Sequence, residues 1–234
     1  MPSVTALSAL SDYSGQLLVG LWRTVLIAVL SYALGVATGL LLGIVCSAGK
    51  AVTRMCIKTY TGLFRALPEL ILILLLYYAS SDALAFVVSH LGLNETALNG
   101  TQVAIIVLAL VTAAYATEIF RAAIEAVPAG LIEAGHSLGM TRAACLRRIT
   151  FPAMLPMALP GLSNLWLMVV KGTSLVSIVG VTELALAAEQ GASATKAYFT
   201  IYFSALILYL ILALGSLRLF NLIETRIRRG LVMP

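Results

Sequence analysis

Apolar stretches long enough to cross a bilayer constrain this chain more than any other feature of its sequence. A spanning helix needs about 20 mostly apolar residues, and such stretches cover residues 18–46, 57–79, 102–119, 156–179 and 198–220. Hydrophobic residues make up 61% of the chain and charged residues 11%, which leaves too little charge to cover a water-facing surface. We therefore predict an all-α integral membrane protein with about five transmembrane helices, built as a single domain over residues 1–234.

The positive charges predict the direction in which the chain crosses the membrane. Twelve of the 15 Lys and Arg residues fall on one side of the predicted spans. They are Lys50, Arg54, Lys58, Arg65, Arg121, Arg142, Arg147, Arg148, Arg218, Arg226, Arg228 and Arg229. Because cytoplasmic loops carry an excess of Lys and Arg, the N-terminus is expected outside and the C-terminus in the cytoplasm. The basic character therefore reflects topology, and we expect no nucleic-acid partner.

Two local patterns predict how the helices are shaped. Pro68 lies inside the second stretch, where the missing backbone donor predicts a kink or a break. Gly35, Gly39 and Gly43 recur every four residues in the first stretch. That spacing favours close approach of another helix, although glycine is also frequent in membrane helices in general.

Patterns for catalysis, metal binding and nucleotide binding are missing from the sequence. Cys46, Cys56 and Cys145 form no ligand spacing, and we predict no metal site and no catalytic residues. The segment 43–50 resembles a phosphate-binding loop, but its spacing is one residue too long and Ala51 replaces the Ser or Thr that would hold magnesium. We therefore expect no cofactor in this chain.

The segment of about residues 121–152 is the longest predicted cytoplasmic loop, and it carries helix signals. Pro128 predicts a break, residues 131–138 a short helix, and Gly139 a left-handed stop after it. Thr141 is a suitable cap for a further helix over 142–149. Such a helix could fit a groove on another protein, or it could lie on the membrane surface with its arginines on lipid phosphates.

This loop resembles the EAA motif of ABC importer permeases, on residues 132–140 and 147–152. Gly135 stands where the motif has its second Ala, which costs roughly 1 kcal/mol of helix stability. Segments 64–69, 115–121, 127–130, 159–164 and 171–177 are similar to the polar amino-acid subfamily, except that Gly172 replaces the usual Asp or Ser. The resemblance runs from the first span to Arg228 and is nearest to the histidine/lysine/arginine/ornithine and octopine/nopaline branch.

The resemblance implies a type I ABC importer fold in the bacterial inner membrane. The chain would pair with a second, similar permease subunit or with itself, and a periplasmic binding protein would deliver polar, in this branch basic, amino acids. Two cytoplasmic ATPase subunits would bind ATP and magnesium, so the chain itself would be no enzyme. The ATPase subunits would bind the loop and drive alternating access through it. Their contacts are expected at Glu133, Ala134, Gly135, Gly139, Met140 and Arg142.

Ionisable residues near the spans are candidates for the substrate pathway or a gate. Lys171 lies inside the fourth stretch, where a charge costs about 2.5–3.5 kcal/mol on insertion scales, and could meet the substrate's carboxylate, a gate carboxylate or a structural partner. Asn164 and Thr173 could line the same path. Glu118 could attract a basic substrate or pair locally with Arg121.

Arg65 and Glu69 flank Pro68 and could form a cytoplasmic gate or simply anchor the helix ends.

Two other classes of membrane protein are rivals to this interpretation. An ion-coupled secondary transporter generally has inverted repeats and more spans, and the sequence has no internal repeat. A membrane-embedded enzyme would need paired acids, a catalytic Ser and His, or a metal set inside the spans. ATP-dependence of uptake separates an ABC importer from a secondary transporter.

Overall fold

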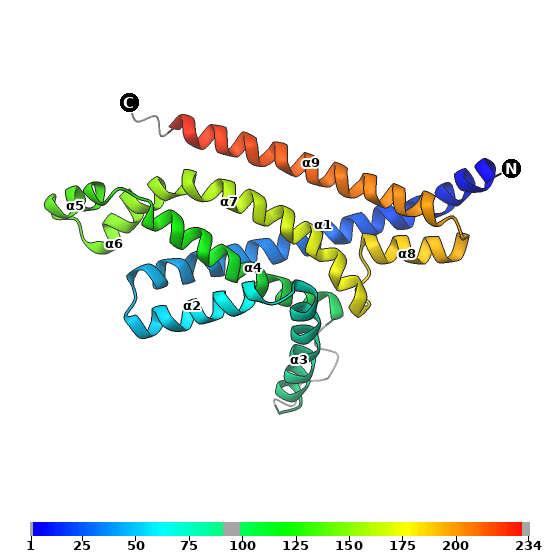
Figure 1. The fold of residues 1–234 in the computed structure, drawn as a ribbon, viewed down its shortest axis with the longest axis horizontal. Helices are drawn as coiled ribbons and strands as arrows, with labels where there is room; N and C mark the ends of the chain where they lie inside the picture. Colours follow the sequence, from blue (N-terminus) through cyan, green and yellow to red (C-terminus); the bar gives the residue numbers. More distant parts are fainter. Residues whose placement is uncertain (1, 91–98, 231–234) are drawn as a thin grey trace. The chain divides into compact units, whose positions relative to one another are not determined.

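The structure, a computed structural model, describes residues 2–90 and 99–230, with side chains over 12–79 and 99–227. Its described residues are helical with short connections, in the order shown in Figure 1. The elements are α1 (Pro2–Ala48), α2 (Ala51–Ala66), α3 (Glu69–His90), α4 (Gly100–Glu125), α5 (Ala129–Ser137), α6 (Arg142–Cys145), the π-helix η2 (Leu146–Thr150), α7 (Phe151–Gly172), the 3₁₀-helix η3 (Thr173–Val179), α8 (Leu184–Thr195) and α9 (Tyr198–Gly230). The predicted all-α class is confirmed.

Four described helical stretches are long and apolar enough to cross a membrane, or five if the bent pair α2 and α3 forms one span. The four cover Asp12–Ala48, Gly100–Glu125, Arg142–Val179 and Tyr198–Ile227. Each contains one of the predicted stretches and extends beyond it. The pair Ala51–Ala66 and Glu69–Ala79 is bent by 115° at residues 67–68, which confirms the break expected at Pro68. The direction of the chain through the membrane stays a prediction.

The helix that contains the fourth predicted span begins at Arg142, well before the predicted start of the span at residue 156. Helix runs without interruption from Arg142, although Pro152, Pro156 and Pro160 all lie within it. A π-helical turn over Leu146–Thr150 directly precedes these prolines. Such a turn changes the hydrogen-bond register of a helix, and membrane helices tolerate proline where local 3₁₀ or π adjustments satisfy the freed backbone groups.

The contacts divide the chain into two compact units, which are described separately below. The first unit contains residues 1–33, 67–110 and 167–215, and the second contains residues 34–66, 111–166 and 216–234. The helices α1, α4, α7 and α9 contribute residues to both units. The interpretation of residues 1–234 as one permease domain stays a prediction.

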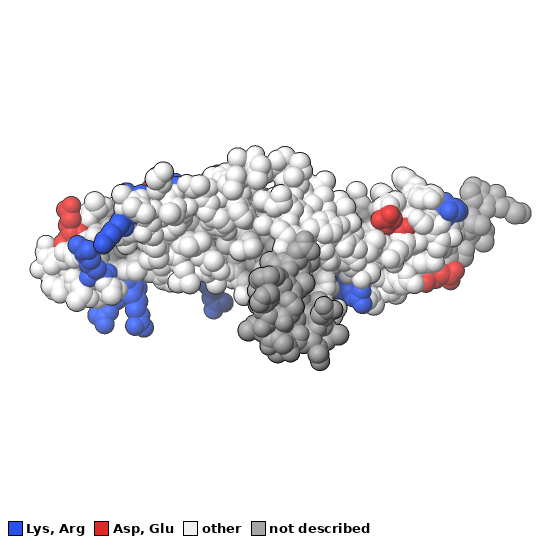
Figure 2. Space-filling model, turned by 90° about the horizontal axis from the view of Figure 1, so that it is seen from below, with Lys and Arg blue, Asp and Glu red and all other residues white. Residues whose placement is uncertain are grey.

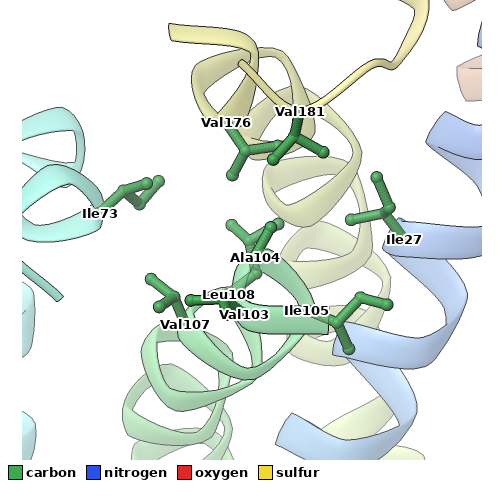
Figure 3. Packing of buried hydrophobic residues seen from close by; sticks show 9 residues of the cluster. All are labelled: Ile27, Ile73, Val103, Ala104, Ile105, Val107, Leu108, Val176 and Val181. Carbon is green, nitrogen blue, oxygen red and sulfur yellow. The ribbon is translucent and has the colours of Figure 1, made fainter. Parts of the chain in front are cut away.

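The first unit has an apolar core built from α1, α3, α4 and the η3 region. Figure 3 shows its side chains pointing toward one another, with Ile27 from α1, Ile73 from α3 and Val176 from η3 around residues of α4. Close packing of this kind stabilises a membrane protein, because lipid tails are as apolar as the side chains and burial alone gives little gain. Ile73 and Val176 of this core follow Glu69 and Lys171 in the chain by four and five residues.

The second unit contains the glycine-lined contact between α1 and α4. Gly39 and Gly43 are buried, and a Cβ atom at Gly39 would lie 2.9 Å from the backbone nitrogen of Thr117. A Cβ at Gly43 would lie 2.9 Å from the Cβ of Phe120. The structure therefore confirms the predicted close helix packing at Gly39 and Gly43.

Replacing Gly39 with Leu should destabilise the protein, because α4 backbone would have to move away. We expect the free energy of unfolding to fall by about 1–3 kcal/mol, the usual cost of overpacking. The measurement is the midpoint of thermal unfolding in detergent, which should be lower. Gly215→Leu is the matched control, because Gly215 is exposed on α9 and a Cβ there meets nothing within 4 Å. Equal midpoints for the two variants would contradict the packing role of the glycine stripe.

Candidate functional site

The predicted coupling loop of the second unit is a rigid helical hairpin. The helix α5 begins after Pro128 and ends at Ser137. Gly139 has φ 77°, its N–H donates to the His136 carbonyl at 2.9 Å, and the Met140 N–H donates to the Gly135 carbonyl at 3.1 Å. These two bonds form a Schellman motif, which satisfies the last carbonyls of the helix. The left-handed stop predicted at Gly139 is therefore confirmed.

One face of α5 is exposed and the opposite face packs inward. Glu133 and Ala134 are exposed, and Leu138 after the helix is 83% exposed. Gly135 is buried instead, and a Cβ there would lie 2.6 Å from Cδ1 of Ile149. The glycine that departs from the EAA pattern thus makes room for an isoleucine and leaves the exposed face unchanged.

The turn after α5 returns the chain toward α7. The Thr141 hydroxyl oxygen accepts a hydrogen bond from the Ala144 N–H at 3.3 Å, which confirms its predicted role as a helix cap. Met140 is half-buried and Arg142 is exposed. Lys and Arg side chains gather at the end of this unit that carries α5 and α6, as Figure 2 shows. The loop therefore presents a firm surface on which Arg142, Arg147 and Arg148 are exposed.

Lys171 and Glu69 lie near each other in the first unit. Lys171 is exposed at the last turn of α7, and Glu69 is half-buried in the first turn of α3. A Cβ on Gly172 would lie 2.9 Å from Oε1 of Glu69, and the Lys171 ammonium acts electrostatically on this carboxylate. Among the residues with described side chains, ion pairs within 4.0 Å join Arg121 to Glu118 and Glu125 and do not include this couple.

Glu118 in the second unit is held by local partners. Its Oε2 accepts hydrogen bonds from Nε and Nη2 of Arg121 at 2.9 and 2.8 Å. Its Oε1 accepts one from the Thr61 hydroxyl at 2.8 Å. The local pairing with Arg121, one of the two interpretations of Glu118, is thus found, and a role of Glu118 in the pathway stays a prediction.

The remaining pathway candidates are placed differently from one another. The Arg65 guanidinium lies 5.7 Å from the centre of the Tyr115 ring in the second unit, whereas Glu69 belongs to the first unit. The predicted gate of these two residues stays a prediction. Asn164 is exposed on α7. Thr173 is fully buried and donates to the Val170 carbonyl at 2.7 Å, and its place along the pathway stays a prediction.

Glu183 is a buried carboxylate that sequence reasoning missed. It is fully buried directly before α8. Its Oε1 accepts from the N–H groups of Ala185 and Leu186 at 2.7 and 3.1 Å. Its Oε2 accepts from the hydroxyls of Tyr209 and Thr24 at 2.6 and 3.1 Å. The carboxylate therefore joins α8 to α1 and α9 while satisfying the start of α8.

A signal for Glu183 was present in the sequence. It is an acidic residue in the apolar segment 175–188, after Gly180, and an ionisable residue within apolar surroundings calls for a partner. Its partners Thr24 and Tyr209 are far away in the sequence, and no spacing rule links them to it.

The fold and the loop can now be compared with known proteins. The family model described as binding-protein-dependent transport system inner membrane component matches residues 35–229. The chain belongs to this family.

Two curated relatives cover almost the whole chain. The histidine/lysine/arginine/ornithine transport system permease protein HisQ of Salmonella typhimurium is 35% identical over 223 residues, which cover 94% of this chain and 97% of the relative. The nopaline transport system permease protein NocQ of Agrobacterium fabrum is 34% identical over 222 residues, or 94% of each chain. The resemblance stated from the loop motif is therefore confirmed.

Solved structures agree with the family. An amino acid ABC transporter solved with histidines matches with a TM-score of 0.78 and 28% identity, over 93% of this chain and 96% of that one. The MetNI methionine ABC transporter matches with a TM-score of 0.75 over 91% and 96%, at 20% identity, and supports the fold alone. The chain is accordingly a membrane-spanning permease component of an ABC importer in the inner membrane, and a stand-alone secondary transporter is not favoured.

Removing the Glu183 carboxylate should strongly destabilise this permease component. Glu183→Ala would leave the amides of Ala185 and Leu186 and the hydroxyl of Tyr209 without their acceptor, at about 1–3 kcal/mol for each buried unsatisfied group. We expect the thermal midpoint in detergent to fall by roughly 6–12 °C for a net loss of about 3 kcal/mol.

Glu183→Gln should lose less stability than Glu183→Ala. The amide oxygen can still accept from Ala185 and Leu186, and the Thr24 hydroxyl can donate instead to the Gly20 carbonyl, 3.1 Å away. Glu189→Gln is the control, because Glu189 is exposed on the same helix. Equal midpoints for Glu183→Ala and the control would contradict the bridging role of the carboxylate.

Proposed function

We propose that this chain imports basic amino acids or the opines derived from them, as one permease subunit of an ATP-driven complex. HisQ and NocQ carry these substrates in their names and match over 94% of the chain, which is the observation that carries the proposal. The complex would hold a second permease subunit, two cytoplasmic ATPases and a periplasmic amino-acid-binding protein. ATP and magnesium would bind to the ATPases, and the N-terminus of this chain would lie outside.

The proposed binding surface for the ATPases is the exposed face of α5 together with the turn that follows it. Glu133, Ala134 and the Gly139 turn form a firm end, because the Schellman bonds and the inward packing of Gly135 leave the helix little freedom. Arg142 lies at the rim, and Met140 supports the turn. A rigid lever of this kind can carry a domain movement from the ATPases to the spans. A helix lying freely on lipid would not need such a stop.

Gly139→Leu should uncouple ATP hydrolysis from uptake. Leu is strained at φ 77°, by roughly 1–2 kcal/mol, so the turn would shift although space around Gly139 is open. In proteoliposomes with the binding protein, we expect arginine uptake to fall by at least about tenfold while ATPase activity and membrane insertion persist. Gly62→Leu is a control, because Gly62 is exposed on α2, outside the loop, and its Cβ would also meet nothing within 4 Å.

Two results would contradict the proposed contact between the loop and the ATPases, and with it the proposed ATP-driven import. The first is ATP-dependent uptake that is unchanged in Gly139→Leu. The second is uptake by this chain alone, driven by an ion gradient.

Glu69 and Lys171 are the proposed contacts for the head group of the amino acid. The two charges are near each other without a direct ion pair, so a zwitterion could place its carboxylate on Lys171 and its ammonium on Glu69. Gly172 keeps the backbone beside Glu69 free of a side chain. Asn164, which is exposed on α7 in the second unit, is proposed separately as a pathway residue.

Lys171→Gln should lower the maximal uptake rate by at least about tenfold, since a hydrogen bond to a charged group contributes about 1.5–3 kcal/mol. Lys171→Arg should retain more activity, and Lys196→Gln, an exposed cation of the same unit, should be normal. The measurement is uptake per complex, with complex abundance determined in parallel. If the double variant Glu69→Gln with Lys171→Gln restored both abundance and uptake, the pair would be structural only.

A further inference from the structure

A pocket between α1 and α8 lies in the first unit. Neither the proposed ATPase contact nor the proposed amino-acid contact involves this pocket. Its volume is about 310 Å³. Polar and small apolar residues line it, namely Gly15, Gln16, Val19, Gly20, Arg23, Thr182, Glu183, Ala187 and Gln190. The Glu183 network holds α8 against α1 (Figure 1), so the two walls of the pocket are fixed relative to each other.

Arg23 is the cation of this pocket and has no protein partner in the described part of the chain. Its side chain is exposed. Gln16 lies seven residues earlier on the same helix, which places the two side chains on one face, and Gln190 lines the pocket from α8. Glu183 does not neutralise Arg23 by direct pairing, because its oxygens accept from amides and hydroxyls.

The position of Arg23 along α1 corresponds to a membrane interface. Arg23 precedes the end of α1 at Ala48 by 25 residues, or about 38 Å at 1.5 Å per residue. That length approaches the about 40–45 Å of a bilayer with its head groups. Lys50 follows the end of α1 at the opposite interface, so Arg23 is expected at head-group level.

The surface around the pocket is suited to lipid. Trp22 is 66% exposed, and Trp side chains prefer the interface between head groups and acyl chains. Leu18 and Val19 are 59% and 53% exposed on the same helix. An anionic head group on Arg23 would therefore have apolar protein surface beside it for its acyl chains.

We propose that this pocket binds the phosphate of a phospholipid, with Arg23 as the charged contact and Gln16 and Gln190 as hydrogen-bond donors. A guanidinium presents paired N–H groups that match phosphate oxygens. A lipid is favoured over the amino-acid substrate because the pocket lining offers no unoccupied carboxylate to receive an ammonium group, whereas apolar surface for acyl chains is at hand. The site is independent of the transport function proposed above.

Native mass spectrometry of the intact importer complex with added phosphatidylglycerol tests this site. The wild type should retain one more phospholipid per copy of this chain than Arg23→Gln under graded removal of lipid. Arg23→Lys should retain part of the binding, since Lys keeps the charge but not the paired donors. Lys196→Gln removes a cation outside the pocket and should retain lipid as the wild type does.

Gly15→Leu provides a second test without a change of charge. A Cβ at Gly15 meets nothing within 4 Å, so the larger side chain should enter the pocket, leave the fold intact and displace the same phospholipid. Equal lipid retention in the wild type, Arg23→Gln and Gly15→Leu would overturn the proposal. So would binding of radiolabelled arginine to the wild type that is lost in Arg23→Gln without any change in retained lipid, because the pocket would then hold the substrate's carboxylate.

Discussion

The need to satisfy every polar group inside hydrocarbon is the constraint on which this structure depends. Each unpaired backbone group in lipid costs several kcal/mol, so a chain of this composition must span the membrane as helices. Side-chain hydroxyls follow the same rule. Thr117 and Ser204 each donate to the carbonyl four residues earlier, so small polar residues can lie in the helices without leaving an unpaired donor.

The carboxylates of Glu183 and Glu118 are satisfied by direct hydrogen bonds. Glu183 receives four hydrogen bonds from one helix start and two hydroxyls, and Glu118 receives its bonds from Arg121 and Thr61. Glu69 and Lys171 differ, because they are close but not directly paired. Charges that are not directly paired are suited to meet a charged substrate, and this difference is why we propose the amino-acid head group at Glu69 and Lys171 and not at Glu118.

The sequence predicted the features that depend on local chemistry. The break at Pro68, the stop at Gly139 and the cap at Thr141 follow from proline, glycine and threonine at their positions, and all three are found. The helix that contains the fourth span begins earlier than the sequence predicts, because Pro152 and Pro156 indicate a boundary and the π-helical turn that precedes them has no sequence rule. The bridge from Glu183 to Thr24 and Tyr209 joins residues far apart in the chain, and only the fold brings them together.

The central claim is that α5 is the point at which a separate ATPase moves this permease. Site-directed crosslinking measures it most directly, with Ala134→Cys on the exposed face of α5 in the assembled complex and with Cys46, Cys56 and Cys145 replaced. The account predicts a crosslink to the ATPase subunit whose yield changes when ATP is added, and no such crosslink from a cysteine at Gly215 on α9. The claim would be contradicted if the cysteine at position 134 reacted only with lipid-soluble reagents, or only with reagents added outside the cell.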